Sequence, residues 1–125
     1  MRLWLDDVRP APKGWLWARS VNEAIELIEL FERSYLCSCK LARHFENTPG
    51  LYYEWLIRMA NDAVGLISMD HDLGDFAADG GDGIKLMDWL LERQTFYPLE
   101  FHTANPVGLE NMRRMYRRYW LREIL

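Results

Sequence analysis

Three short apolar runs in this chain each end at a group of polar side chains. The runs are RLWL (2–5), VGLISMD (64–70) and PLEFHT (98–103). A nearly continuous apolar run of this kind is typical of a strand buried in a parallel sheet. The polar residues therefore mark the carboxyl ends of three predicted strands, and these ends are the first candidates for a functional site.

Helix-forming segments separate the predicted strands. Residues 20–33 begin with a capping-box pair, Ser20 and Glu23, and then place apolar residues on one face at helical spacing. The segment 83–93 predicts a further helix, and Pro106 suits the first position of a last one. Strands that alternate with helices predict an α/β fold with a mostly parallel sheet of about four strands.

One connection does not fit a simple parallel sheet. WLWAR (15–19) predicts a second strand only about nine residues after the first, and a parallel crossover usually needs a dozen or more. This strand is therefore expected to be antiparallel or to be reached through an extended loop. Residues 35–62 have mixed periodicity, with a helix predicted over 52–60, and we interpret them as an insertion in a single domain, 1–125.

Composition narrows the classes of function. The net charge of −4 argues against nucleic-acid binding by bulk attraction, and neither a signal peptide nor a membrane-spanning run is recognisable. We therefore expect a cytoplasmic protein. Cys37, Cys39 and His44 offer three zinc ligands where a structural site uses four, so free thiols are the simpler interpretation.

Open α/β sheets bind ligands beyond the carboxyl ends of their strands. Asp6, Asp7 and Asp70 would meet there if the first and middle strands are neighbours. Two carboxylates about 4 Å apart repel by roughly 4 kcal/mol at an effective dielectric near 20, so such a cluster needs a cation, a shared proton or an arginine. An all-oxygen site of this kind suits Mg²⁺ with a substrate phosphate, and Arg9 is placed to clamp that phosphate.

Two histidines lie at adjacent predicted strand ends. His71 and His102 could face each other across a phosphate, one as general base and the other as general acid, because histidine transfers protons near neutral pH. The alternative is a hydrogen-bonded structural role for either ring. Thr103 and Asn105 can hydrogen-bond phosphate oxygens, although Asn105 is equally suited to cap the following helix.

Other polar features have plainer interpretations. Asp75, Asp79 and Asp82 fall in a glycine-rich loop and are expected to cap helices or form turns. Residues 113–122 (RRMYRRYWLR) carry five arginines interleaved with aromatic residues. This pattern indicates either an RNA-contacting face or, as the simpler interpretation, an amphipathic helix with its aromatic stripe in the core and its arginines in solvent.

The motifs resemble a known family. LDDVRPAP, SMDHDLG, GDGIKLMDWL and HTANPVGLENM occur in this order and are similar to the cyclic-phosphate-processing receivers, a derivative of the response-regulator receiver fold. The resemblance covers most of the chain at both ends and leaves out residues 35–62. It implies a flavodoxin-like sheet flanked by helices, and no segment here matches the lysine-bearing last strand that receivers usually have.

The resemblance also implies roles for the acidic residues. Asp7 and Asp70 would be Mg²⁺ ligands with Asp6 in support, and Thr103 would lie near the phosphoryl group. The implied activity is the opening of cyclic phosphates, such as the 2′,3′-cyclic ends of cleaved RNA.

On this resemblance His71 is an added proton-transfer group that a switch domain does not need. Asp72 would offer its backbone carbonyl to the metal, while its side chain orients His71 or a water. The preferred mechanism is hydrolysis with His71 and His102 sharing the acid and base roles, assisted by Mg²⁺ or, if the two histidines suffice, without a metal. Two rivals use the same pocket: a receiver-type signalling module and a binder of cyclic nucleotides without turnover.

Overall fold

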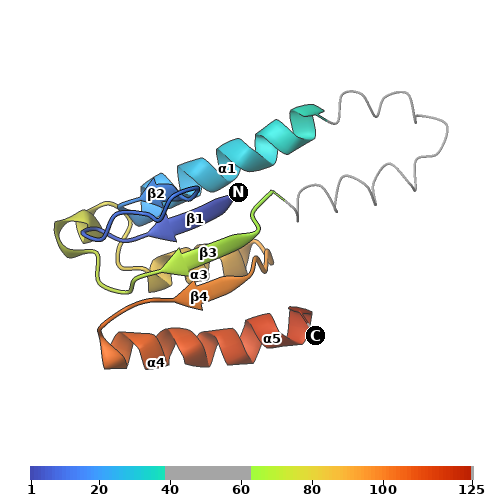
Figure 1. Ribbon diagram of the computed structural model, residues 1–125. Helices are drawn as coiled ribbons and strands as arrows, with labels where there is room; N and C mark the ends of the chain where they lie inside the picture. The colour runs from blue at the N-terminus through green and yellow to red at the C-terminus, as the bar shows by residue number, and fades with distance from the viewer. Residues whose placement is uncertain (39–62, 125) are drawn as a thin grey trace.

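A computed structural model describes residues 1–38 and 63–124 of the chain. Its four strands are β1 (Arg2–Leu5), β2 (Leu16–Ala18), β3 (Leu66–Met69) and β4 (Leu99–Phe101). They form one sheet in the order β2-β1-β3-β4, and every neighbouring pair is parallel (Figure 1). The predicted α/β fold is confirmed, and the three strands with polar ends are direct neighbours. The helix predicted over 52–60 lies outside the described residues, as do Cys39, His44 and most of the segment interpreted as an insertion.

The connection from β1 to β2 is an extended loop. β2 pairs with β1 in parallel, so the antiparallel alternative is wrong and the extended-loop alternative is confirmed. Residues 6–15 make this return without a helix. About ten extended residues reach roughly 33 Å, well over twice the length of a four-residue strand, so the loop has enough chain to come back. A hydrogen bond of 3.1 Å from Asp6 N to the Ala18 carbonyl extends the pairing beyond the strand ends.

The helices begin at recognisable signals. They are α1 (Val21–Ser38), the short 3₁₀ helix η2 (Gly74–Ala78), α3 (Ile84–Glu92), and α4 (Pro106–Met115), which continues through a π-helical turn, η3 (Tyr116–Trp120), into α5 (Leu121–Ile124). At the start of α1, Ser20 Oγ accepts from Glu23 N at 3.1 Å, as the capping box predicts. None of the helices formed by residues 1–38 and 63–124 is both long and apolar enough to span a membrane.

The core lies on one face of the sheet. Leu3 and Leu5 of β1, Ile67 and Met69 of β3 and Leu99 of β4 point to that face and are buried. They share a single cluster with apolar residues of α1, α3 and α4, and Figure 1 shows α3 behind the sheet. On the other face Arg2 and Glu100 are exposed. Trp4 and Ser68 lie on this same face, in register on neighbouring strands, and Ser68 is in register with Glu100 on its other side.

Two sequence-based expectations concern the inward faces of helices. The sequence predicts Ile84, Met87 and Leu91 on the inward side of α3, and Met87 is fully buried there. The other fully buried residues are Leu86 and Leu90, whereas Ile84 and Leu91 are only partly buried. The C-terminal helix is amphipathic in the expected sense, since Met112 and Trp120 are fully buried. Its five arginines are all exposed: Arg113, Arg114, Arg117, Arg118 and Arg122.

Candidate functional site

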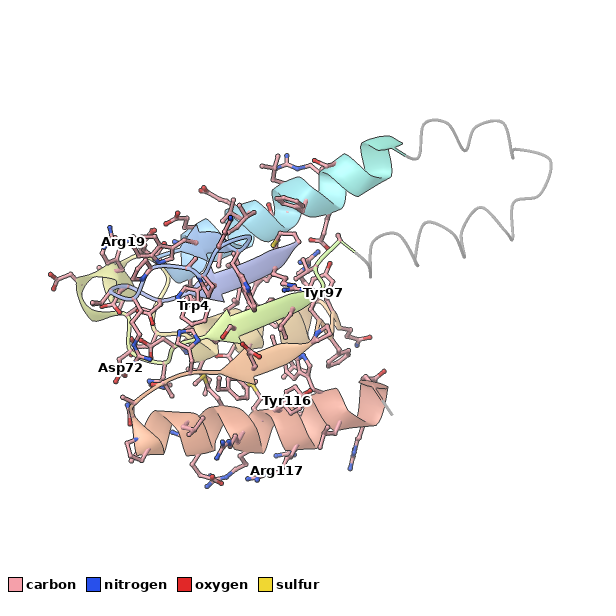
Figure 2. The ribbon with its side chains drawn as sticks, viewed as in Figure 1. Trp4, Arg19, Asp72, Tyr97, Tyr116 and Arg117 are labelled. Atoms are coloured by element: carbon pink, nitrogen blue, oxygen red, sulfur yellow. The ribbon has the colours of Figure 1, made fainter. Side chains whose placement is uncertain are left out.

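The carboxyl ends of β1, β3 and β4 bring the candidate residues together. One carboxylate oxygen from each of Asp6, Asp7 and Asp70 lies within 4.8 Å of the others. His102, which follows β4, reaches Asp6, which follows β1, with 3.0 Å between Nε2 and Oδ2. Figure 2 shows Asp72 beyond the tips of the strands at this same end of the sheet. The predicted convergence of three distant segments is therefore present.

Asp6 organises the loop after β1. Its side chain is 1% exposed, and its Oδ1 accepts hydrogen bonds from the backbone N–H groups of Val8 (2.9 Å) and Arg9 (2.8 Å). Its second oxygen, Oδ2, faces His102. A buried carboxylate is stable only when it is paired and hydrogen-bonded, and Asp6 meets both conditions within the protein. Asp6 thus turns the chain and holds His102.

His102 is held on three sides. Its Nδ1 lies 2.8 Å from Ser68 Oγ, and its ring stacks on Trp4 with centroids 3.8 Å apart and an interplanar angle of 6°. Because a carboxylate can only accept, the consistent assignment has Nε2–H donating to Asp6 and the Ser68 hydroxyl donating to Nδ1. The neutral ring of His102 therefore uses both of its nitrogens inside the protein.

The burial of His102 predicts a pH dependence of stability. Desolvation by burial lowers the pKa of His102 from its ordinary value of 6.5 and outweighs the opposing effect of the Asp6 carboxylate. The unfolded chain therefore takes up this proton first as the pH falls. We expect the free energy of unfolding to decrease as the pH falls below about 6.5, and His102 to add no pH dependence above that value.

In the variant His102→Gln, the free energy of unfolding should lose the pH dependence that comes from His102. The substitution should also lower the free energy of unfolding near neutral pH by about 1–3 kcal/mol, because Ser68 and Asp6 lose a buried partner. Urea unfolding between about pH 5 and 8 measures both effects in the wild type and the variant. The same pH dependence in both proteins would contradict the assignment.

His71 has a different environment. Its Nδ1 lies 2.7 Å from Asp72 Oδ1, while its Nε2 has no hydrogen-bond partner among residues 1–38 and 63–124. Asp72 also accepts from Asn105 Nδ2 at 3.1 and 3.2 Å. The hydrogen bonds from His71 and then Asn105 lower the pKa of Asp72, so the carboxylate stays ionised and Nδ1 of His71 carries the proton. The free lone pair of the neutral ring is then on Nε2.

The start of α4 supports this pair. Asn105 caps the helix, since its Oδ1 accepts from the backbone N–H groups of Val107 and Gly108 at 3.1 Å each. The capping alternative for Asn105 is thus confirmed, and the same amide also holds Asp72. A Cβ atom on Gly108 would lie only 2.7 Å from Cδ2 and from Nδ1 of His71, so the ring packs directly on the glycine. Thr103 Oγ1 accepts from Asn105 N at 3.2 Å and fixes the turn.

Arg9 extends over the site from the loop after β1. One of its terminal nitrogens, Nη1, donates to the His102 carbonyl at 3.0 Å, and its Nε lies 3.8 Å from Asp6 Oδ2. The side chain is 52% exposed, and its remaining N–H groups make no hydrogen bond with any residue that the structure describes. Arg9 is therefore oriented by the protein while it keeps donors free for an anion.

A comparison with known protein families gives a match to the amino-acid sequence. The sequence profile of the cyclic-phosphate processing receiver domain matches residues 1–38 and 32–118. The chain belongs to this family. Neither the curated proteins nor the solved structures contain a significant match. The family match confirms the resemblance that the four sequence motifs indicate.

The acidic residues of this receiver fit a hard divalent cation. Asp7 makes no side-chain hydrogen bond with any described residue, and Asp70 uses only Oδ1, which accepts from His71 N at 2.8 Å. Two carboxylates with unused oxygens are the donor set that Mg²⁺ prefers. Asp6 is less available, because both of its oxygens already have partners. The residues therefore fit Mg²⁺ through Asp7 and Asp70, with Asp6 in support.

A second group of potential ligands in the receiver is already engaged. His71, Asp72 and Asp82 bring ligand atoms within 4.8 Å of one another. Asp72 binds His71, and Asp82 Oδ1 accepts from Leu73 N at 3.2 Å, which fits the turn role expected for Asp82. Asp79 likewise has a structural role, because it accepts from Ser20 Oγ at 2.7 Å at the start of α1.

Sequence reasoning missed three residues of the receiver site. Ser68 and Trp4 hold His102, and Gly108 supports His71. Ser68 carried a signal, since a lone polar residue inside an apolar strand needs a buried partner. Gly108 and Trp4 carried none, because their contacts depend on how α4 and the loop after β4 meet the sheet.

Proposed function

We propose that this receiver hydrolyses cyclic phosphodiesters, with His71 as the general base. The observation that carries the proposal is the asymmetry of the His71 ring. Its Nδ1 is held by Asp72, and its Nε2 has no partner in the described part of the chain. The family description, cyclic-phosphate processing, supports the class of substrate.

The proposed reaction adds water across one phosphorus–oxygen bond of the ring. The water oxygen bonds to phosphorus while Nε2 of His71 takes its proton, and the ionised Asp72 stabilises the resulting imidazolium. The bond from phosphorus to one ribose oxygen breaks. That oxygen recovers the proton from His71, directly or through a water, so the product is a phosphomonoester beside a free hydroxyl group.

The two histidines have unequal parts in this proposal. The sequence suggested that His71 and His102 share the acid and base roles. Both nitrogens of His102 are bonded within the protein, to Ser68 and to Asp6. We therefore assign His102 to positioning: it holds Asp6, and its carbonyl holds the guanidinium of Arg9.

Arg9, Thr103 and the carboxylates would bind the phosphate. Arg9 offers charged N–H donors to the phosphate oxygens, and the Thr103 hydroxyl still has a proton to donate. Mg²⁺ held by Asp7 and Asp70 would neutralise part of the phosphate charge when bound.

The purified protein is expected to open 2′,3′-cyclic AMP to a phosphomonoester, measured by phosphorus NMR or chromatography of the products. Asp70→Asn should reduce turnover and its response to magnesium, because one unused carboxylate oxygen is lost. Asp75→Asn is the matched control, since Asp75 is exposed on η2 and its side chain makes no hydrogen bond or ion pair with any described residue. Absence of ring opening while the nucleotide still binds would contradict hydrolysis and favour a binding or signalling module.

A further inference from the structure

The C-terminal helix starts at the candidate site and leads away from it. Its cap, Asn105, donates to Asp72, and Gly108 in its first turn packs on the ring of His71. At 1.5 Å per residue, Arg113 lies about 8 Å along the helix from Gly108, and Arg122 about 21 Å along it. The helix therefore provides one path along which a linear ligand bound by its end at His71 can extend.

The outer side of this helix carries five exposed arginines, which we call the arginine strip: Arg113, Arg114, Arg117, Arg118 and Arg122. Figure 2 shows Arg117 on the side away from the sheet and Tyr116 toward it. Arg117 pairs with Glu110 at 2.9 Å, and the Arg118 guanidinium lies 5.3 Å from the centre of the Tyr119 ring. Within the described residues, the side chains of Arg113, Arg114 and Arg122 have no ion pair or hydrogen bond.

The π-helical turn aligns the two ends of the helix. Met112 and Trp120 are eight positions apart, which in a regular α-helix rotates them about 80° from each other. A π-helical turn takes up roughly one extra residue, so it reduces this offset to about 20°. Both side chains are fully buried as a result. The same shift brings Arg122 into line with Arg114, so the turn that buries Trp120 also extends the arginine strip.

The charge of this helix is opposite to that of the rest of the protein. Residues 106–124 carry five arginines and two glutamates, a net charge of +3, whereas the whole chain has −4, which leaves −7 for the remainder. Arg113 and Arg117 are four residues apart, and so are Arg114 and Arg118. Like charges at this spacing destabilise a helix. Phosphate groups bound between the guanidinium groups would remove this repulsion.

We propose that the arginine strip binds the phosphate backbone of single-stranded RNA whose cyclic 3′ end is in the His71 site. This inference rests on the proposed function and narrows its substrate from cyclic phosphodiesters in general to the cyclic end of an RNA strand that also contacts α4 and α5. The strand runs in the 5′ direction from the site along α4 and α5. Stacked at about 3.4 Å per nucleotide, about six nucleotides cover the 21 Å from Gly108 to Arg122. Tyr119 with the Arg118 guanidinium on its ring offers a surface for a base.

The test compares binding and turnover in matched variants. Arg113→Gln/Arg114→Gln removes two charges from the strip, and Arg2→Gln/Arg33→Gln removes two exposed charges from β1 and α1. Binding of a labelled six-nucleotide RNA with a 3′-phosphate is followed by fluorescence anisotropy against salt concentration. Turnover is measured on 2′,3′-cyclic AMP and on the same RNA with a cyclic end.

We expect the salt slope of log K for RNA to fall by about 1.4 in the strip variant, because each lost phosphate contact on a single strand contributes about 0.7. The control variant should keep the wild-type slope, and turnover of 2′,3′-cyclic AMP should be unchanged in both. An unchanged RNA slope in the strip variant overturns the proposal even if the mononucleotide is hydrolysed, and leaves an acidic protein as the ligand to test. A third result is RNA binding that depends on salt and is lost in the strip variant, while the wild type turns over neither substrate. This result would support RNA binding by the arginine strip and overturn the proposed hydrolase activity.

Discussion

Replacing His71 with alanine is expected to lower kcat for cyclic-phosphate opening by about 10²–10⁴-fold, the usual contribution of general acid–base catalysis. The reason is the position of its free lone pair. With Nδ1 bonded to Asp72 at 2.7 Å, only Nε2 can accept a proton from water. The substrate should still bind, because Arg9 and the carboxylates do not depend on the His71 side chain for their hydrogen bonds.

Two further measurements separate proton transfer from a structural effect. Added imidazole should restore part of the activity of His71→Ala, since it can enter the space beside Gly108 and act as the base. Asp72→Asn should also lose activity, because it removes the acceptor that keeps the proton on Nδ1. Asp75→Asn is the same chemical change on an exposed residue and should be neutral. Full activity in His71→Ala would rule out the proposed base.

The positions of the strand ends could be predicted because their signals are local. Each apolar run shows in a few consecutive residues, and the polar group that follows it marks the end of the strand. β3 matches its predicted run closely, since Ile67, Ser68 and Met69 are all buried there. Since parallel strands end at one edge of a sheet, the meeting of Asp6, Asp70 and His102 followed from the predicted fold.

The separate roles of the two histidines could not be predicted. His71 and His102 are the same residue type, and each closely follows a strand, His71 two residues after Met69 and His102 directly after Phe101. What distinguishes them is a set of contacts between distant residues. His102 is bonded to Ser68, 34 residues earlier, and to Asp6, 96 residues earlier. No local pattern encodes such pairs, so the sequence left both rings equally suited to proton transfer.

The sequence also left undecided how the chain connects β1 to β2. Chain length alone argued against a parallel pair, because the expectation assumed a crossover by a helix. The loop 6–15 needs no crossover helix, because it returns in an extended conformation and its side chains contact β1. Trp15 meets Trp4 edge to face with ring centroids 6.0 Å apart, and the Trp4 indole donates to the Arg9 carbonyl at 2.9 Å. The loop that makes the fold unusual thus also places Arg9 over the site.

Gly108→Ala is expected to lower kcat by about 10²-fold while the protein stays folded. Alanine suits a helix better than glycine by roughly 0.5–1 kcal/mol, so the backbone of α4 accepts the change. The new methyl group, however, would lie 2.7 Å from Cδ2 and from Nδ1 of His71, which is too close for either atom. The ring must move away from Gly108, and a misplacement of about 1 Å in a catalytic group costs on the order of 10²-fold in rate.

Gly65→Ala is the control for this substitution. Gly65 precedes β3 at the opposite end of the sheet, and a Cβ there would meet only the Met1 carbonyl, at 3.7 Å, an ordinary contact. Both variants should keep their circular dichroism spectra, and only Gly108→Ala should lose turnover, with KM for 2′,3′-cyclic AMP little changed. A loss in kcat alone means that the ring of His71 acts in the chemical step, because the three atoms nearest the added methyl group all belong to that ring. Normal turnover in Gly108→Ala would mean that the reaction tolerates a displaced His71 ring. This result would contradict the role of His71 as a general base held in place by Asp72.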